Sequence, residues 1–191
     1  MPLFDTATRK DRFRTRNKIV KEVALPALQG QGFIQAPYPS WFGIYPGNRL
    51  YIYELCRLKG PDLLQLVEIF VHYGDRYIQI FVNVVRLQPA PATVEALNVS
   101  DPLHFGMPPI SWSKMRLRLD GQKGPPILRI FDREHKLGSS WTSAGFERRA
   151  KRLSQLIEQD MLGIDGFFDR WHELHEPQEV HWTMKWEERR P

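Results

Sequence analysis

The stretch that decides the fold is LLQLVEIFVHYGDRYIQIFVNVVRL, residues 63–87. It is rich in the β-branched and aromatic residues that suit a half-buried pleated surface, and it has Gly74-Asp75 at its centre. We therefore expect two long antiparallel strands, Leu63–Tyr73 and Arg76–Leu87, joined by a two-residue hairpin turn. Every other residue of the second strand is aliphatic, which predicts one face packed on a core and another that is only partly wet.

Working outward from the hairpin, the sequence predicts strands before it and amphipathic helices at both ends of the chain. In chain order the other expected elements are a helix at about Arg9–Leu28, strands at Phe33–Gln35, Trp41–Tyr45 and Arg49–Leu58, a proline-rich connector at Gln88–Ser111 with one helical turn at Thr93–Leu97, strands at Lys114–Leu119 and Ile127–Phe131, and helices at about Ser143–Met161 and Asp165–His175. Helices segregated from consecutive antiparallel strands define the α+β class. We predict an antiparallel sheet of about five to seven strands, with the N-terminal helix and the C-terminal helices packed on it.

The length of 191 residues suits a single domain, which we place at residues 1–176. The tail, residues 177–191, alternates like a strand and contains Trp182 and Trp186. Two indoles in a terminal tail favour burial over contact with water. We therefore expect the tail to dock on the domain or on a partner subunit, which makes a homodimer one of the expected states.

The composition excludes several classes of protein. Cys56 is the single cysteine, so neither an intrachain disulfide nor a cysteine-based zinc site can form. The first residues, MPLFDTATRK, lack the apolar run of a signal peptide, and no stretch approaches the roughly 18 apolar residues of a membrane helix. We expect a cytoplasmic protein with no membrane partner. No glycine-rich phosphate loop or Gly-x-Ser-x-Gly elbow is present, so the sequence indicates no cofactor.

The net charge of +5 is concentrated at the start of the chain, where residues 1–31 hold seven Lys or Arg and three Asp or Glu. Basic side chains recur at helical spacing in the first helix, in one row of the strand at Lys114–Leu119, and near the start of the long C-terminal helix. The candidate nucleic-acid or anion contacts are Lys10, Arg14, Lys18, Lys21, Arg116, Arg118, Arg148 and Arg152. Such cations neutralise phosphates. The alternative interpretation of each cluster is a solvated surface.

Aromatic residues before the hairpin and one histidine at its turn form a second candidate site. Trp41, Phe42, Tyr51, Tyr53 and His72 are predicted to bind a ligand, by lining a cleft or stacking on bases. His72 also shares a strand face with Glu68 and neighbours Glu54, an arrangement that can tune a general base. The alternatives are an aromatic cap on the core and a polar, solvent-facing row on the sheet.

The helix predicted at Asp165–His175 carries the candidate metal ligands, which are Asp169, His172, His175 and Glu176. Their spacing keeps them within reach of one side of the helix, and histidine with carboxylate suits zinc or iron. A charged surface helix gives the same residues, and no glutamate general base is fixed by a motif.

The segment Val20–Leu28, followed by Gly32-Phe33, resembles the opening of a bacterial family known as domain of unknown function 4304. That family is similar in its leading helix, which ends in a Pro-x-Leu turn before a Gly-Phe entry to the sheet, and in a late helix preceded by a loop like Ser140-Trp141. The resemblance implies an α+β fold and transfers no activity or catalytic residue. On function, the resemblance implies only an analogy, at the level of the fold, with immunity proteins and toxin-associated proteins.

Three hypotheses for function follow from these patterns. The first is a binding or interaction protein without catalysis, with a protein partner or a second copy of the chain, because no catalytic constellation stands out. The alternative is a basic, nucleic-acid-associated protein. The second alternative is a metal-dependent hydrolase that uses the histidine and carboxylate cluster. Salt-dependent binding distinguishes the nucleic-acid hypothesis, and stoichiometric bound metal distinguishes the hydrolase.

Overall fold

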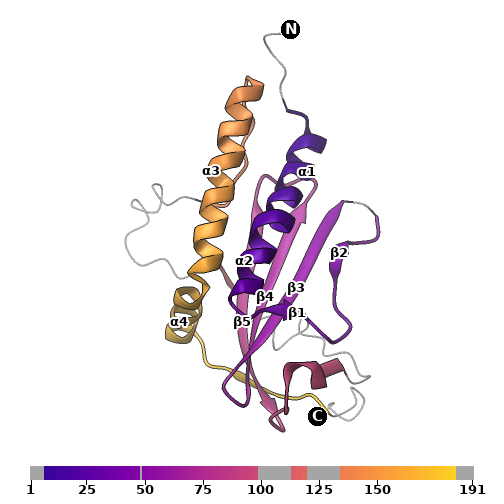
Figure 1. Cartoon of the computed structure of the whole chain (residues 1–191), viewed down its shortest axis with the longest axis vertical. Coiled ribbons are helices and arrows are strands. Elements are labelled where there is room, and N and C mark those ends of the chain that lie inside the picture. The colour runs from indigo at the N-terminus through magenta and orange to yellow at the C-terminus, as the bar shows by residue number, and fades with distance from the viewer. Residues whose placement is uncertain (1–6, 48, 99–112, 120–133, 184–191) are drawn as a thin grey trace.

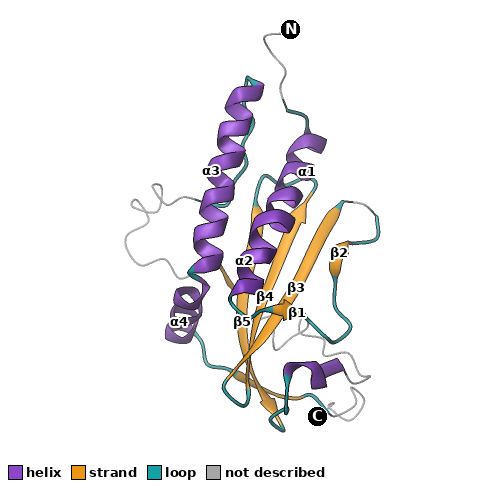
Figure 2. Ribbon diagram, in the orientation of Figure 1, coloured by secondary structure: helices purple, strands orange, loops and turns teal. Residues whose placement is uncertain are grey.

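The computed structural model describes residues 7–47, 49–98, 113–119 and 134–183, which form an α+β fold as predicted (Figure 2). The helices are α1 (Arg9–Ile19), the π-helical η1 (Val20–Ala24), α2 (Leu25–Gly30), the 3₁₀ segment η2 (Val94–Asn98), α3 (Ser143–Leu162) and α4 (Ile164–Leu174). The strands are β1 (Ile34–Gln35), β2 (Phe42–Ile44), β3 (Leu50–Lys59), β4 (Leu63–His72), β5 (Ile78–Gln88), β6 (Met115–Arg116) and β7 (Gln178–His181).

The seven strands form one open sheet built around the predicted hairpin. The order is β1-β3-β4-β5-β6, with β2 also paired to β3, and β7 paired to β5 as the one parallel neighbour among the described strands. The last pair of the β4–β5 ladder is Val71 with Ile78, so the connection is longer than the predicted two-residue turn. The reason is Asp75, whose carboxylate accepts hydrogen bonds from the backbone N–H groups of Arg76 and Tyr77 and stabilises a wider loop.

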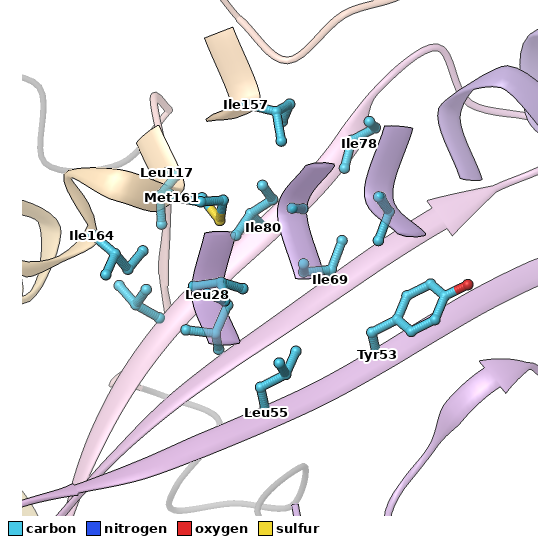
Figure 3. Close-up of a cluster of buried hydrophobic side chains, with 14 of the residues drawn as sticks. Leu28, Tyr53, Leu55, Ile69, Ile78, Ile80, Leu117, Ile157, Met161 and Ile164 are labelled. Atoms are coloured by element: carbon cyan, nitrogen blue, oxygen red, sulfur yellow. The ribbon is translucent and has the colours of Figure 1, made fainter. Parts of the chain in front are cut away.

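Helices cover one face of this sheet, and Figure 1 shows α1 and α2 in front of the strands with α3 beside them. The core between the two layers contains the aliphatic side chains of β4 and β5 together with apolar residues from every long helix. Figure 3 shows ten of these side chains converging, namely Leu28, Tyr53, Leu55, Ile69, Ile78, Ile80, Leu117, Ile157, Met161 and Ile164. The alternation predicted for β5 is confirmed, because Ile78, Ile80, Val82 and Val84 are at most 1% exposed.

The N-terminal helix is continuous from Arg9 to Gly30 but changes its winding at η1. Thr8 caps the start, since its hydroxyl accepts from the N–H of Asp11 and the Asp11 carboxylate accepts from the N–H of Thr8. Pro26 has no N–H to donate to the carbonyl of Glu22, and the π-helical turn lies directly before it. The change in winding therefore lies just before the proline, while the last turn, α2, stays α-helical.

Arg16 is a buried cation that ties α1 to the β4–β5 loop. Its side chain is 0% exposed, and its guanidinium donates to the carbonyl of Tyr77 at 2.8 Å and to the carbonyl of His72 at 3.0 Å. Burial lowers the pKa of Arg16 to about 10, against the opposing charge of Asp75. The Tyr77 carbonyl gains a buried donor in this way, and the His72 carbonyl gains one in addition to the N–H of Asp75, which lies 3.2 Å away.

A second, smaller core covers part of the opposite face of the sheet. Tyr38, Leu97 and Val180 pack there against apolar residues of β3, β4 and β5. Val180 belongs to β7, and the indole N–H of Trp182 donates to the carbonyl of Pro89 at 2.7 Å. The described part of the tail thus docks on the domain. The rest of the tail, with Trp186, and the strand predicted at Ile127–Phe131 lie outside the described residues.

The strand predicted at Lys114–Leu119 is shorter than expected, because pairing ends at Arg116. Arg118 takes a left-handed backbone conformation with φ 59°, which turns the chain out of the alternating pattern. Leu117 is buried, whereas Leu119 is 49% exposed. The predicted row of three cations on one face is therefore wrong.

Among the described residues, no helix combines the length and the apolar character that a membrane span requires.

Replacing Arg16 with Met is expected to lower the free energy of unfolding by about 2–4 kcal/mol, because the carbonyls of His72 and Tyr77 lose their buried donor. Arg14→Met, on the exposed side of the same helix, is the matched control and is expected to change stability by about 0.5 kcal/mol or less. Urea unfolding at one pH measures both. Equal effects of the two changes would show that the buried guanidinium does not anchor the loop.

Candidate functional site

The first basic element is the stripe on α1 and η1. Lys10, Arg14, Lys18 and Lys21 are all exposed, on the side of the helix opposite the core residues Phe13, Ile19 and Val20. Two carboxylates lie close to the stripe: the charges of Arg14 and Lys10 act on Asp11 in the first turn, and Lys18 is 3.8 Å from Glu22 in an exposed pair. Such a pair is weak in water, so the stripe keeps most of its positive potential. Helical spacing predicted this surface correctly.

The second basic element is the exposed side of α3, which contacts α1 in the helical layer (Figure 1). Residues 143–152 hold four cations, Arg148, Arg149, Lys151 and Arg152, against the single acid Glu147, and all five side chains are exposed. α1 and α3 begin at the same end of the molecule (Figure 1), so their two sets of cations lie on neighbouring helices of one layer. We call the α1 stripe and the four α3 cations together the basic helical surface.

A groove of about 620 Å³ runs between α3 and the chain segment 134–136. Its charged lining consists of Lys136, Arg149 and Arg152 with one acid, Glu134. Within the described ranges none of the three cations forms an ion pair. Arg149 donates instead to the carbonyl of Ser139, and the Lys136 ammonium lies 5.2 Å from the ring centre of Tyr77. We call this feature the α3 groove.

The predicted cations of β6 and the turn after it divide between different environments. Arg116 lies 5.5 Å from the ring centre of Tyr77, so it is near Lys136 and the α3 groove. Lys114 is bound to Glu68 at 2.6 Å, and Arg118 is bound through two nitrogens to Asp160. Arg116 is thus the member of this row that lies near Lys136, while the charge of Arg118 is balanced by Asp160.

The predicted aromatic site is also divided. Tyr53 is 3% exposed, donates to the side-chain oxygen of Asn17 at 2.7 Å and meets Phe42 edge to face. Tyr51 stacks on Phe13 at 4.9 Å beneath α1. These three side chains face the helical core and are not displayed to a ligand. Trp41 differs from these three side chains in its exposure, because 45% of it is exposed to solvent.

The most exposed large apolar side chain among the described residues is Trp141, at 79%. It directly precedes Thr142, the N-cap of α3, whose hydroxyl accepts from the N–H of Gly145. A Cβ at Gly145 would lie 2.3 Å from the hydroxyl of Ser140, so this turn requires glycine there. The packed turn fixes the backbone on which the indole stands, two residues from the carbonyl that holds Arg149.

Glu54 and Glu68 are direct neighbours across β3 and β4, on the face away from the helices. Glu68 is 8% exposed and is bound to Lys114. Burial raises the pKa of Glu54 to about 7, the charge of Glu68 acts in the same direction, and a hydrogen bond with the Trp41 backbone opposes both. His72 is exposed and lies four residues, or about 13 Å, along β4 from Glu68. The predicted histidine and carboxylates therefore do not form a contact, while the two carboxylates do form a pair.

A buried ionic network lies between α3 and the sheet edge. The Asp160 carboxylate, 4% exposed, contacts Nε2 of His135 at 2.6 Å and accepts from the Arg118 guanidinium at 2.6 Å. Burial alone would raise the pKa of Asp160, but hydrogen bonds and charge from Arg118 and His135 outweigh it and hold the pKa below its usual range. His135 and Arg118 also line a pocket of about 180 Å³. The network holds segment 134–137 against α3, so it positions one wall of the α3 groove.

The candidate metal ligands lie on or just after α4 without forming a ligand set. Asp169, His172 and Glu176 are exposed, and the rings of His172 and His175 pack against Trp171 at 5.1 and 5.4 Å. In the part of the chain that the structure describes, no three His, Cys, Asp or Glu side chains are arranged to hold a metal ion. The histidines on this helix therefore pack around a buried indole.

Sequence reasoning missed Lys136, His135 and Asp160, which shape the groove and its wall. Asp160 lies in α3 beside the apolar stripe of Leu153, Ile157 and Met161, so helical spacing places it on the buried face. A charged residue on a buried helix face needs a partner, and this signal could have predicted the Asp160 network. No local signal marked His135 or Lys136, because they follow a segment without periodicity.

Comparison with known proteins adds no relative, since no family model, curated protein or solved structure matches the chain. The resemblance to the domain of unknown function 4304 family is neither supported nor contradicted by this result and stays a prediction.

The raised pKa of Glu54 predicts a pH dependence of stability. A carboxyl that titrates near 4.5 when unfolded and near 7 when folded holds its proton more tightly in the folded state. Its contribution is full below pH 4.5 and is lost as the pH rises through 7. We expect the wild-type protein to lose about 1–2 kcal/mol between pH 5 and 8 relative to Glu54→Gln, after allowance for solvent screening. Parallel pH profiles of the two proteins in urea unfolding would contradict this.

Removing the buried charge of Asp160 is expected to be costly. Asp160→Asn leaves the guanidinium of Arg118 and the imidazole of His135 without their shared acceptor, and we expect a loss of about 3 kcal/mol in the free energy of unfolding. Glu158→Asn, an exposed carboxylate two residues earlier in α3, is the matched control and should cost under about 0.7 kcal/mol. Chemical denaturation measures both, and equal costs would refute a stabilising network.

Proposed function

We propose that this protein is a non-catalytic binding protein whose partner is nucleic acid, held through the basic helical surface. The observation that carries the proposal is the convergence of two basic clusters, far apart in the sequence, on neighbouring helices. Four exposed cations of α1 and η1 and four of α3 share one layer of the molecule. A set of this size matches the several phosphate contacts that give nucleic-acid binding its affinity.

The distribution of acids supports the same partner. The net charge of the whole chain is only +5, so the excess matters through its placement. Several carboxylates are paired outside this surface, namely Asp165 with Arg57, Asp62 with Arg86 and Asp160 with Arg118, and the acids within it are Asp11, Glu22 and Glu147 against eight cations. The basic helical surface therefore presents a positive field to solvent, and an extended polyanion complements it better than a neutral partner.

The described geometry favours binding without catalysis. Catalysis would require a nucleophile, an acid–base group and a stabiliser of developing charge around one space. Glu54 and Asp160, two carboxyls whose pKa is shifted, lie on opposite sides of the sheet. The basic helical surface contains neither of them. Its exposed cations on rigid helices suit positioning of phosphates.

The experiment is a fluorescence-anisotropy titration of a labelled 15-nucleotide strand and of its duplex at several salt concentrations. We expect log K to fall linearly with log salt for the wild-type protein. The variant Lys10→Gln with Arg14→Gln should bind more weakly and lower the slope by about 1 to 2, because each lost phosphate contact removes about 0.7–0.9.

The matched control is Lys59→Gln with Arg86→Gln, which removes two exposed cations at the end of the sheet far from the β4–β5 loop. Both variants carry the same net charge, so they separate position from overall charge. The control should bind as the wild-type protein does. Binding that is absent at low salt, or weakened equally by the two variants, would overturn the proposal.

A further inference from the structure

The α3 groove differs from the convex helices beside it because it is a channel with cations on both walls. Lys136 stands on one wall, and Arg149 and Arg152 stand on the other. Apolar side chains of α3, Leu153 and Leu156, line the same space. The volume of about 620 Å³ is far larger than a single phosphate requires, and it falls within the range of ligand sites.

Trp141 precedes the N-cap of α3, on the N-terminal side of the groove residues Arg149 and Arg152. Trp141 to Arg152 spans eleven residues, of which the helical part rises about 15 Å along α3. The chain from Lys136 to Trp141 runs beside this part of the helix, since Ser139 contacts Arg149. The groove and the indole therefore follow one another along α3. An indole that is 79% exposed on a fixed turn offers a flat surface that the fold itself does not use.

A cationic channel beside an exposed aromatic ring matches the chemistry of one ligand class. Duplex DNA hides its base faces inside the stack, so an isolated indole gains little from it. Unpaired nucleotides expose both a phosphate backbone and a π-face, and base–aromatic stacking tolerates any sequence. An acidic peptide would satisfy the cations, but it has no ring to stack on the indole.

We propose that the α3 groove binds single-stranded nucleic acid, with phosphates held between Lys136, Arg149 and Arg152 and an unpaired base stacked on Trp141. This inference rests on the proposed function and names its substrate class and its site. The basic helical surface supplies general attraction for phosphates, while the groove and the indole select strands with unpaired bases.

Two variants test the two halves of the site against a 15-nucleotide polythymidine strand and a 15-base-pair duplex. Trp141→Ala should weaken binding of the single strand by about 5- to 100-fold without changing the salt slope, because it removes stacking and no charge. Trp141→Phe should recover part of the loss. Lys136→Gln with Arg152→Gln should lower the single-strand salt slope by about 1.4, since two contacts of about 0.7 each are lost. Thermal unfolding of each variant checks that the fold is kept.

The outcomes separate the inference from the function on which it rests. A single strand that binds more tightly than the duplex, with a loss in Trp141→Ala confined to the single strand, supports the inference. Salt-dependent binding that is equal for strand and duplex and unaffected by Trp141→Ala overturns it and leaves the basic helical surface as the binding site. A polyglutamate peptide that binds as tightly as the strand also overturns it, in favour of an acidic protein partner. Absence of any salt-dependent binding removes the function as well.

Discussion

The burial of β4 on both of its faces is the constraint on which the rest of the structure depends. β4 is paired along its length with β3 on one side and β5 on the other, so its backbone groups are satisfied within the sheet. Its side chains alternate between two cores, one beneath the helices and one beneath η2 and β7. A central strand of this kind requires two covering layers, and this requirement explains why helices collect on one face and why the short C-terminal strand returns to the other.

The same constraint accounts for the unusual ionisable groups. A buried polar side chain on these strands, or on a helix packed against them, is either paired or shifted in pKa. Glu68 is paired with Lys114, Glu54 holds its proton to about pH 7, and Arg16 is enclosed by backbone carbonyls with its pKa lowered to about 10. These groups are consequences of a two-sided core. Their environments are accounted for by packing and need no catalytic role.

Periodicity in the sequence predicted the elements that are defined by residues close together in the chain. The hairpin pairing, the long helices and the docked strand in the tail follow from local spacing. What failed depended on side-chain contacts that residue spacing does not encode. The turn at Gly74-Asp75 is wide because Asp75 binds three groups beyond it, and the row after Lys114 breaks because Arg118 turns toward Asp160, 42 residues away. The groove was hidden for the same reason, since Lys136 and Arg152 meet only in the folded chain.

Two covered faces also limit where a ligand can be held. A sheet with one open face can bind along its strands, but here the described strands are paired or packed over most of their length. Among the described residues, two of the remaining surfaces are the outer sides of α1 and α3 and the edge of the sheet where segment 134–136 meets α3. Both carry cations, and the buried Asp160 network holds segment 134–137 against α3. Convex basic helices beside a basic groove suit a long polyanion that crosses both, because such a partner gains contacts from each without a deep pocket.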